Sequence, residues 1–356
     1  MINLGRGMNV GGWLSQGKLT EEWRKTFVTK ADIERIAGWG FDNIRFPFDL
    51  PLLCPTPEAR EPCEAGMAWL DRGLEWMTQA GLKVSMDMHS LPGYTFMDLT
   101  HKPDEVPLLF RCESCQAHFV ELWVALAKRY LGRFPNVAFE LANEIAAPTG
   151  QQWNELAAKA IAGIRSVDKD RVIVVGSNCW NVCFTFTELA VVDDPNIIYH
   201  FHFYNPFTFT HQRVEWSPEL LYYGKEVRYP GRSPDLRAAA KRAQDEGQRQ
   251  GLVDALLSYA DFFEDRVSDK QHLRELMKDS FDFAAKHKVP LYCGEFGTMH
   301  YVPQPDGLKW VKDTIEIFAE KNVAWSYWSY KGCHSGIVDM DGNINTPGLL
   351  ETLQGK

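Results

Sequence analysis

The 356-residue sequence predicts an α/β fold, a single (β/α)8 TIM barrel. Short runs that are apolar almost throughout recur eight times along the chain, as expected of parallel strands buried on both faces. Amphipathic stretches with helical spacing alternate with most of these runs. No linker, low-complexity segment or internal repeat divides the chain, so we expect one domain over residues 1–356. A doubly wound open sheet is the alternative arrangement of the same elements.

The strand candidates are rich in β-branched and aromatic residues, which favour pleated, buried backbone. Polar residues and turn residues follow most of them, which marks where each strand ends. In chain order the candidates are residues 5–11, 42–47, 82–88, 137–143, 171–176, 196–203, 289–294 and 323–328.

Helix candidates occupy most of the intervals between the strands. Thr29 and Asp32 have the spacing of a capping box and predict a helix that begins at residue 30. Gly81 stands where a C′ glycine belongs after a periodic apolar stretch. The predicted helices are residues 30–38, 67–80, 113–131, 151–166, 269–287 and 305–321.

The interval after the sixth strand is much longer than the others. It runs from Tyr204 to Lys288, whereas a whole βαβ unit needs only about 30 residues. An aromatic, proline-containing stretch at 204–234 precedes a polar helical stretch at 235–263. We expect an inserted subdomain at residues 204–265, above the C-terminal ends of the strands, where barrels carry their active sites.

Composition limits the partners of the protein. The formal net charge of −9 argues against nucleic acid and anionic membranes, which both require a basic face. No apolar run approaches the roughly 20 residues of a membrane span. The first residues lack the features of a signal peptide, so the sequence as it stands predicts a cytoplasmic monomer. An extracellular address stays open if a leader was removed or export is non-standard.

Polar and aromatic residues stand at the ends of most predicted strands. In a barrel these ends meet at one mouth. A structural role explains one or two such residues, but buried polar groups must be satisfied, so it explains the whole set poorly. The strand-end residues are Arg45, His89, Asn143, Glu144, His202, Tyr204, Glu295 and Trp328.

Glu144 and Glu295 lie on the fourth and seventh predicted strands, on opposite sides of the ring. Two carboxyl groups that face each other across a cleft are what cleavage of a glycosidic bond requires. One is protonated and donates to the departing oxygen, while the other is ionised and attacks carbon or activates water. Arg45 near Glu295 would hold that carboxylate ionised. These residues predict a glycoside hydrolase without a cofactor.

Six strand-end motifs resemble those of glycoside hydrolase family 5, the retaining cellulase-like barrels. They are "GFDNIRFP", "DMHS", "FELANE", "HFHFYNPF", "CGEFG" and "AWSYW", in the order of the family. The segments "YNPFTFTHQRVEW" and "YCGEFG" are similar to small single-domain bacterial endoglucanases of the endoglucanase C type. The resemblance covers nearly the whole chain.

The resemblance implies that Glu144 is the acid/base and Glu295 the nucleophile of a retaining mechanism. It also implies that Asn143 contacts the 2-hydroxyl of the sugar. A retaining pair is about 5–5.5 Å apart, which we therefore expect here. Many members have proline after the acid/base residue, where this chain has Ile145. Proline there shapes a turn and performs no chemistry.

Supporting roles follow from the same resemblance. Arg45 would support the nucleophile, and Tyr204 would hydrogen-bond to it. His89 and His202 would line the −1 sugar site. Trp328 would stack beneath a sugar ring.

The substrate implied by the resemblance is a β-linked oligo- or polysaccharide. Endo-β-1,4-glucanase activity on cellulose or mixed-linkage glucan is the prediction. The segment "RGMNVGGWL" is also similar to exo-β-1,3-glucanases of the same clan. An exo-β-1,3-glucanase, a β-glucosidase and a β-mannanase would use the same catalytic pair and remain alternatives.

Two hypotheses from other classes compete with this one. His200 and His202 form an H-x-H pair which, with Asp87 and His89, could ligate a metal in an amidohydrolase-like barrel. A carbohydrate-binding barrel that lacks catalysis is the second, but both carboxyl groups are present. We expect His200 to lie in the barrel interior and Glu140 to form a buried ion pair.

Three aromatic residues and four cysteines leave further alternatives open. The aromatic residues could stack sugars at outer subsites, although most tryptophans must belong to the core. The cysteines could form a structural zinc site near the mouth, or be independent thiols or disulfides. These residues are Trp180, Trp216 and Tyr223, and Cys54, Cys63, Cys112 and Cys115.

Overall fold

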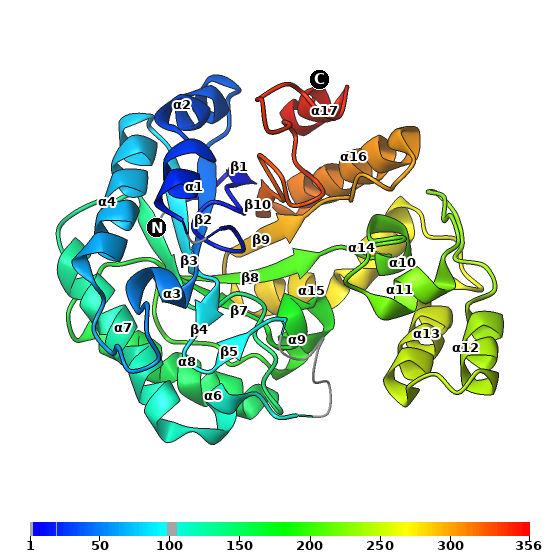
Figure 1. The fold of residues 1–356 in the computed structure, drawn as a ribbon, viewed down its shortest axis with the longest axis horizontal. Helices are drawn as coiled ribbons and strands as arrows, with labels where there is room; N and C mark the ends of the chain where they lie inside the picture. The colour runs from blue at the N-terminus through cyan, green and yellow to red at the C-terminus, as the bar shows by residue number, and fades with distance from the viewer. Residues whose placement is uncertain (1–2, 19, 98–104) are drawn as a thin grey trace.

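The computed structural model describes residues 3–18, 20–97 and 105–356 and confirms the predicted barrel (Figure 1). Parallel strands close into a ring in the order β1-β2-β3-β6-β7-β8-β9-β10, and β10 pairs back onto β1. A short antiparallel hairpin, β4 with β5, follows β3. The strands are β1 Arg6–Asn9, β2 Asn43–Phe48, β3 Lys83–Met88, β4 Ser90–Leu91, β5 Tyr94–Thr95, β6 Val137–Glu140, β7 Ile173–Gly176, β8 Ile197–Phe203, β9 Leu291–Phe296 and β10 Ala324–Tyr327.

Every barrel strand overlaps its predicted range, and the largest difference is at the end of β6. The strand was expected to reach Asn143 but ends at Glu140. Beyond it the backbone still bonds to both neighbours, because Leu141 N–H donates to Val174 O and Asn143 N–H donates to Met88 O, both at 3.1 Å. The segment therefore rises above the rim of the barrel while it stays attached to it.

Helices surround the barrel, and their local signals are those expected. Thr29 and Asp32 form the predicted capping box at the start of α2, and Gly81 follows α4 with a φ of 76°. The helices that precede β8 are α1 Glu21–Thr26, α2 Lys30–Gly38, α3 Leu50–Leu53, α4 Glu64–Gln79, α6 Leu108–Arg111, α7 Glu113–Tyr130, α8 Gly150–Arg165, α9 Asn178–Asn181 and the 3₁₀ helix η1 Cys183–Glu188.

Several helices lie between β8 and β9, in the long interval that the sequence marks. In Figure 1, α12 and α13 lie side by side at the edge of the molecule, beyond α10 and α11, and they pack against each other through buried apolar residues. The helices after β8 are α10 Phe207–Thr210, α11 Pro218–Tyr223, α12 Leu236–Asp245, α13 Gln250–Phe263, α14 Lys270–Leu276, α15 Lys278–His287, α16 Gln304–Lys321 and α17 Leu349–Gln354.

The helix predicted at 269–287 is two helices, α14 and α15, which meet at Met277. The hydroxyl of Ser280 donates to the carbonyl oxygen of Met277 at 2.7 Å, and a serine bonded in this way competes with the regular ladder. After β7 the sequence predicts no long helix, and the structure has only the short α9 and η1 there.

The barrel interior is apolar at one level and charged at another. Ala138, Val174, Ile198 and Tyr292 form a small buried cluster inside the ring. Buried charged groups lie on the same strands nearer the C-terminal ends, where Arg45 is fully buried. The charged level is the floor of the candidate site. In the described part of the chain, no helix combines the length and the apolar character that a bilayer span requires.

Candidate active site

The predicted strand-end side chains lie together at the C-terminal mouth of the barrel. Arg45 on β2 contacts the β9 side, since its Nη1 donates to Glu295 Oε1 at 2.5 Å. It also contacts the β6 side, since its Nη2 donates to Asn143 Oδ1 at 2.9 Å. The rings of His89 and Trp328 stack with centroids 5.8 Å apart. Residues from far apart in the sequence thus form one contiguous cluster.

The two candidate carboxyl groups, Glu144 and Glu295, face each other. One oxygen of each, together with one nitrogen of His202, lie within 4.8 Å of one another. His202 Nδ1 lies 2.9 Å from Glu144 Oε1 and 3.6 Å from Glu295 Oε2. The Glu144 side chain is 16% exposed, so it is still reached by solvent, and that of Glu295 is 6% exposed.

A buried arginine organises the negative charges below the carboxyl pair. Besides Glu295, Arg45 forms ion pairs with Glu140 at 2.6 Å and with Asp87 at 2.9 Å. Burial opposes the charge of Arg45, but its three acidic partners outweigh burial and raise the pKa of Arg45 above its usual value. Burial alone would raise the pKa of Glu140, yet the charge of Arg45 lowers it. The predicted buried ion pair of Glu140 is therefore confirmed.

The environment of Glu144 favours its protonated form. Burial, and then the negative charge of Glu295, raise the pKa of Glu144 well above its usual range. Burial, followed by the positive charge of Arg45, lowers the pKa of His202 well below its usual range. A neutral His202 therefore stands between a protonated Glu144 and a Glu295 that is paired with a cation. Such separation of two carboxyl groups is the basis of acid/base division of labour.

Tyr204, just beyond β8, belongs to the Glu295 side of the site. Its hydroxyl donates to Glu295 Oε2 at 2.9 Å. Burial and the charge of Glu295 raise the pKa of Tyr204 well above its usual value, so the hydroxyl remains a donor. Glu295 therefore receives one hydrogen bond on each oxygen, from Arg45 and from Tyr204.

Replacing Tyr204 by phenylalanine is expected to lower kcat by about 10–100-fold, because a hydrogen bond to a charged group contributes about 1.5–3 kcal/mol. Steady-state hydrolysis of a β-glucan measures the effect. Tyr222→Phe is the matched control, since Tyr222 also donates to a glutamate, Glu246 at 2.8 Å, but on the surface. Equal rates for Tyr204→Phe and the native protein would contradict the role of this hydroxyl.

The outer aromatic predictions have different outcomes. Trp180 is 38% exposed, and Trp216 is half-buried with its ring 4.9 Å from that of His334. Tyr223 is only 4% exposed, and its hydroxyl donates to Pro234 O. Contrary to the prediction, Tyr223 is packed in the core and offers no ring face to a saccharide. Its position on α11, whose inner face is apolar, explains the burial.

Two groups of potential metal ligands occur among the described residues, and neither includes a cysteine. The predicted zinc cluster of Cys54, Cys63, Cys112 and Cys115 is therefore wrong. Cys54 Sγ lies 3.7 Å from His118 Nε2 instead. The loops that carry the cysteines were expected to converge, but that depended on their path and not on their spacing.

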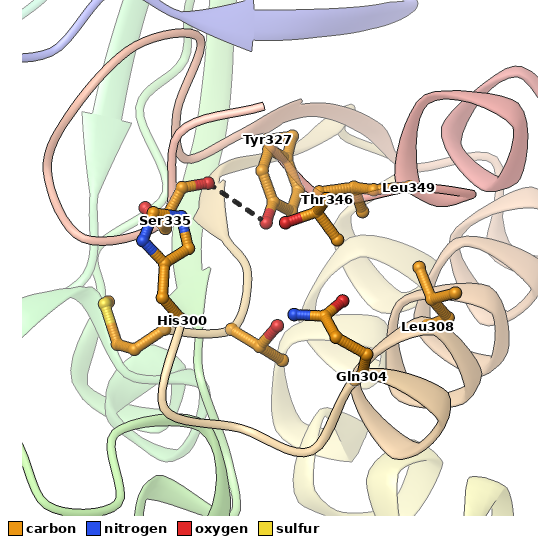
Figure 2. Close-up of a pocket in the computed structure, with 10 residues that line it drawn as sticks. His300, Gln304, Leu308, Tyr327, Ser335, Thr346 and Leu349 are labelled. Carbon is orange, nitrogen blue, oxygen red and sulfur yellow. Dashed lines mark hydrogen bonds between the residues drawn. The ribbon is translucent and has the colours of Figure 1, made fainter. Parts of the chain in front are cut away.

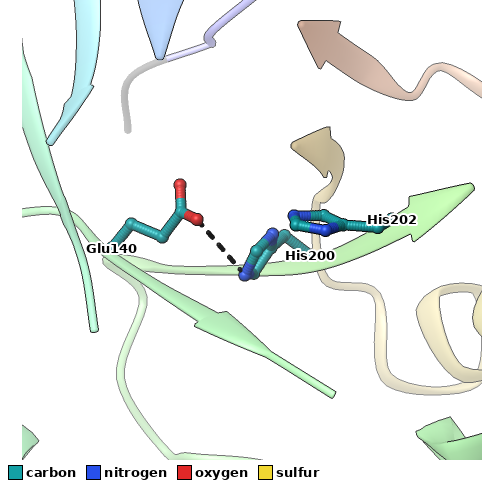
Figure 3. A group of neighbouring side chains, drawn as sticks. All are labelled: Glu140, His200 and His202. Atoms are coloured by element: carbon teal, nitrogen blue, oxygen red, sulfur yellow. Dashed lines mark ion pairs between the residues drawn. The ribbon is translucent and has the colours of Figure 1, made fainter. Parts of the chain in front are cut away.

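The H-x-H pair does not suit a divalent cation. Figure 3 shows Glu140 and His200 joined by a contact of 3.7 Å, with His202 beside them. Glu140 is already bonded to the buried guanidinium of Arg45, so a metal there would meet a fixed positive charge. Burial lowers the pKa of His200 to about 4, which fits the interior histidine that was expected.

A separate small cavity lies beside the barrel mouth, between the start of α16 and the chain that follows β10 (Figure 2). It has room for about one water molecule, so it is too small for a sugar ring. The cavity contains none of the predicted site residues. It is lined by Thr298, Met299, His300, Gln304, Gly307, Leu308, Tyr327, Ser335, Thr346 and Leu349.

Sequence reasoning missed three residues of the cluster. Asn9 ends β1, and its Oδ1 accepts from Arg45 Nη1 at 3.2 Å. The strand-end rule could have found it. Tyr94 donates its hydroxyl to the carbonyl oxygen of Glu144, and Asn181 donates toward His200. Both follow irregular chain, where no periodic signal points to a direction.

A (β/α)8 barrel with two opposed carboxyl groups at its C-terminal mouth is the arrangement of a glycoside hydrolase. The chain belongs to the cellulase family, glycosyl hydrolase family 5, whose family model matches residues 5–334. The resemblance of the strand-end motifs is thereby confirmed.

Known proteins similar to this chain include endoglucanases. Endoglucanase C of Acetivibrio thermocellus is 36% identical over 342 residues, which cover 96% of this chain and 95% of that protein. Cellodextrinase A of Ruminococcus flavefaciens is 30% identical over 90% of this chain and 83% of its own length. The crystal structure of endoglucanase Cel5A from Thermotoga maritima has a TM-score of 0.74 at 24% identity, covering 98% of this chain and 97% of that one, and supports the fold.

Proposed function

We propose that the protein is a retaining endo-β-1,4-glucanase that cleaves cellulose or mixed-linkage glucan. The observation that carries this proposal is the Glu144–Glu295 pair, with oxygens within 4.8 Å in surroundings that favour opposite protonation states. Retaining enzymes have carboxyl groups about 5–5.5 Å apart, whereas inverting enzymes need about 6.5–9.5 Å to admit a water. The names of the endoglucanase relatives support the β-1,4-glucan substrate.

In the proposed mechanism Glu295 attacks the anomeric carbon while Glu144 donates its proton to the departing glycosidic oxygen. A covalent glycosyl-enzyme forms, and the shortened chain leaves. Glu144, now ionised, takes a proton from water, which attacks the same carbon and releases Glu295. Two inversions give net retention. Both groups belong to the chain, so the proposed reaction needs no cofactor.

The remaining site residues support these steps. Arg45 and Tyr204 orient the Glu295 carboxylate through its two oxygens. Because Oδ1 of Asn143 accepts from Arg45, its NH2 group is the part that can donate to the 2-hydroxyl. His89 and His202 line the −1 site.

Aromatic surfaces complete the proposed binding site. Trp328, stacked on His89, forms the floor beneath the sugar ring. The apolar faces of pyranose rings suit such surfaces. We propose Trp180 and Trp216, both still partly exposed, as outer subsites.

Residues 204–265 form an inserted subdomain in this proposal, within a single catalytic domain of residues 1–356 that acts as a monomer. Helices α11 to α13 support the subdomain, since they stand apart from the barrel in Figure 1. Val214 and Leu220 pack with Met299 beyond β9, which attaches the segment to the mouth. A segment in that position borders the cleft and influences which chain ends can enter.

A product profile on carboxymethylcellulose, barley β-glucan, laminarin and mannan tests the proposal. We expect a rapid fall in viscosity of the first two polymers with few new reducing ends, as internal cleavage produces. Laminarin and mannan should be hydrolysed at least about tenfold more slowly, since each 1.4 kcal/mol of lost transition-state binding costs a factor of ten. Release of glucose alone from chain ends, or preference for laminarin or mannan, would replace the endo-β-1,4-glucanase proposal.

A further inference from the structure

A left-handed turn follows β7, in the segment that connects β7 to η1. Cys179, Trp180 and Asn181 have φ angles of 53°, 59° and 59°. Left-handed backbone is unfavourable for residues that carry a Cβ, and runs of it are rare. Three such residues in succession persist only where the surroundings hold them, and such places are concentrated at functional sites.

The turn is attached to the chain that immediately follows Glu144. Ala147 N–H donates to Asn178 Oδ1 at 2.7 Å, and Asn178 Nδ2 donates to Ala147 O at 3.0 Å. Trp180 N–H donates to Ile145 O at 3.0 Å. These three hydrogen bonds hold the turn and the Glu144 segment in a fixed relative position.

Inside the barrel, the turn places the amide of Asn181 against two histidines. Asn181 is fully buried, and its Nδ2 lies 3.3 Å from His200 Nε2 and 3.5 Å from His202 Nε2. An NH2 group has two protons, so it can donate to both rings. Gly176 makes the room, because a Cβ there would lie 2.5 Å from Asn181 Oδ1 and 2.6 Å from His200 Nε2.

The direction of these hydrogen bonds determines the tautomer of His202. If Nε2 accepts from Asn181, a neutral ring must carry its proton on Nδ1. Nδ1–H then donates to Glu144 Oε1, which lies 2.9 Å away. A carboxyl group that accepts a hydrogen bond on Oε1 keeps its own proton on Oε2. The proton is thus available to a leaving group and is not lost to the histidine.

We propose that Asn181 is a positioning residue, which holds His202 in the Nδ1–H tautomer and thereby keeps the acid proton of Glu144 on Oε2. This inference rests on the proposed function, in which Glu144 is the acid/base. After proton transfer, the same Nδ1–H stabilises the Glu144 carboxylate that must act as base.

Other charged and titratable groups face Glu144 and His202 from the neighbouring strands, and the test leaves all of them in place. Burial and the positive charge of Arg45 keep His202 neutral, as the tautomer argument requires. The facing groups are Arg45 of β2, Asp87 and His89 at β3, His200 of β8 and Glu295 of β9.

Two variants of Asn181 separate the amide from the backbone. Asn181→Asp keeps the size and tolerates left-handed φ, but it has no NH2 donor at neutral pH. Asn181→Gly keeps the backbone accessible and removes the amide altogether. Asn322 is the matched control, because it also has a left-handed φ, 54°, but lies on the surface after α16.

We expect kcat/KM for cellohexaose to fall about 10–100-fold in both Asn181 variants, since general acid catalysis contributes about 10²–10⁴-fold and would be partly lost. With 2,4-dinitrophenyl β-cellobioside, whose leaving group needs no proton, kcat/KM should fall less than about threefold. Asn322→Asp and Asn322→Gly should leave both values unchanged. Equal losses on the two substrates would overturn the inference, because they would indicate a general structural role.

The tautomer is measured directly by 15N NMR of imidazole-labelled protein, with the His202 signals assigned by their loss in His202→Gln. We expect a protonated Nδ1 and an unprotonated Nε2 in the native protein, and a protonated Nε2 in Asn181→Asp. A native His202 with its proton on Nε2 would overturn the inference.

Glu144→Gln, measured on the same two substrates, separates this inference from the proposed function. If Glu144→Gln shows the leaving-group dependence and the Asn181 variants do not, only the role of Asn181 is wrong. If Glu144→Gln lacks it as well, the acid/base assignment itself fails.

Discussion

Replacing Glu295 by glycine is expected to reduce kcat on β-glucan by on the order of 10⁴-fold or more, because no other group can form the covalent intermediate. Arg45 and Tyr204 hold its two oxygens, and the remaining oxygens of the cluster belong to acids that are deeper in the barrel or paired elsewhere. Initial rates on barley β-glucan, measured at enzyme concentrations high enough to detect the residue of activity, give the size of the loss.

Azide gives the Glu295→Gly experiment a second, qualitative result. With an activated aryl cellobioside, azide should enter the space left by the carboxylate and restore part of the rate. Because it attacks from the nucleophile's face in a single displacement, the product should be the α-glycosyl azide, with inversion. A β-glycosyl azide would assign the nucleophile to another residue.

Loss of Glu295 also removes a partner of the buried Arg45, so the variant must be shown to fold. Breaking a buried ion pair costs about 3–5 kcal/mol, although Glu140 and Asp87 still compensate the charge here. Glu295→Gln, which keeps the shape, is the companion variant. Glu246→Gln, on the surface, controls for the substitution itself. A native circular dichroism spectrum and thermal transition establish that lost activity is not lost structure.

Glu144→Gln is expected to lower kcat/KM for cello-oligosaccharides by about 10²–10⁴-fold, the usual contribution of general acid catalysis. The value for an activated aryl cellobioside should change little, because that leaving group departs without a proton. Azide should raise kcat for the activated substrate and give the β-glycosyl azide, which is the opposite stereochemistry to that of the Glu295 variant. A loss of equal size for both substrates would contradict the acid/base assignment.

The pH profile of the native enzyme provides an independent check on Glu144. Burial and the charge of Glu295 raise the pKa of Glu144 well above its usual range. An acid must be protonated to act, so kcat/KM is retained below that pKa and is lost as the pH rises through it. The basic limb of the profile should therefore lie well above the range of an exposed carboxyl group. In Glu144→Gln this limb should disappear.

The fold could be predicted because its signals are local. Apolar runs identified the strands, and the capping box of Thr29 and Asp32 identified the start of α2. The end of β6 was placed at Asn143 and not at Glu140, since the apolar pattern continues although the ladder stops. Two adjacent residues, Asn143 and Glu144, stood out because a buried segment has no local reason to end on polar groups.

The misplaced residues share a different cause. Tyr223 has the composition of a sugar-binding residue, but its neighbours on α11 turn it into the core. Cys54 and Cys112 lie on loops whose paths depend on what they cross, and Cys54 ends beside His118. Contacts of this kind join segments that are remote in sequence, and no pattern within either segment reports them.

The sequence by itself therefore determined the eight-stranded barrel, the residues at its mouth and the two carboxyl groups. Hydrophobic period, caps and strand ends follow from the physics of short segments. Only the tertiary structure decided how these groups are charged and aimed, through the burial of Arg45 and the left-handed turn that brings Asn181 to His202. Ionisation and direction depend on desolvation and on partners across the fold, which a linear pattern does not contain.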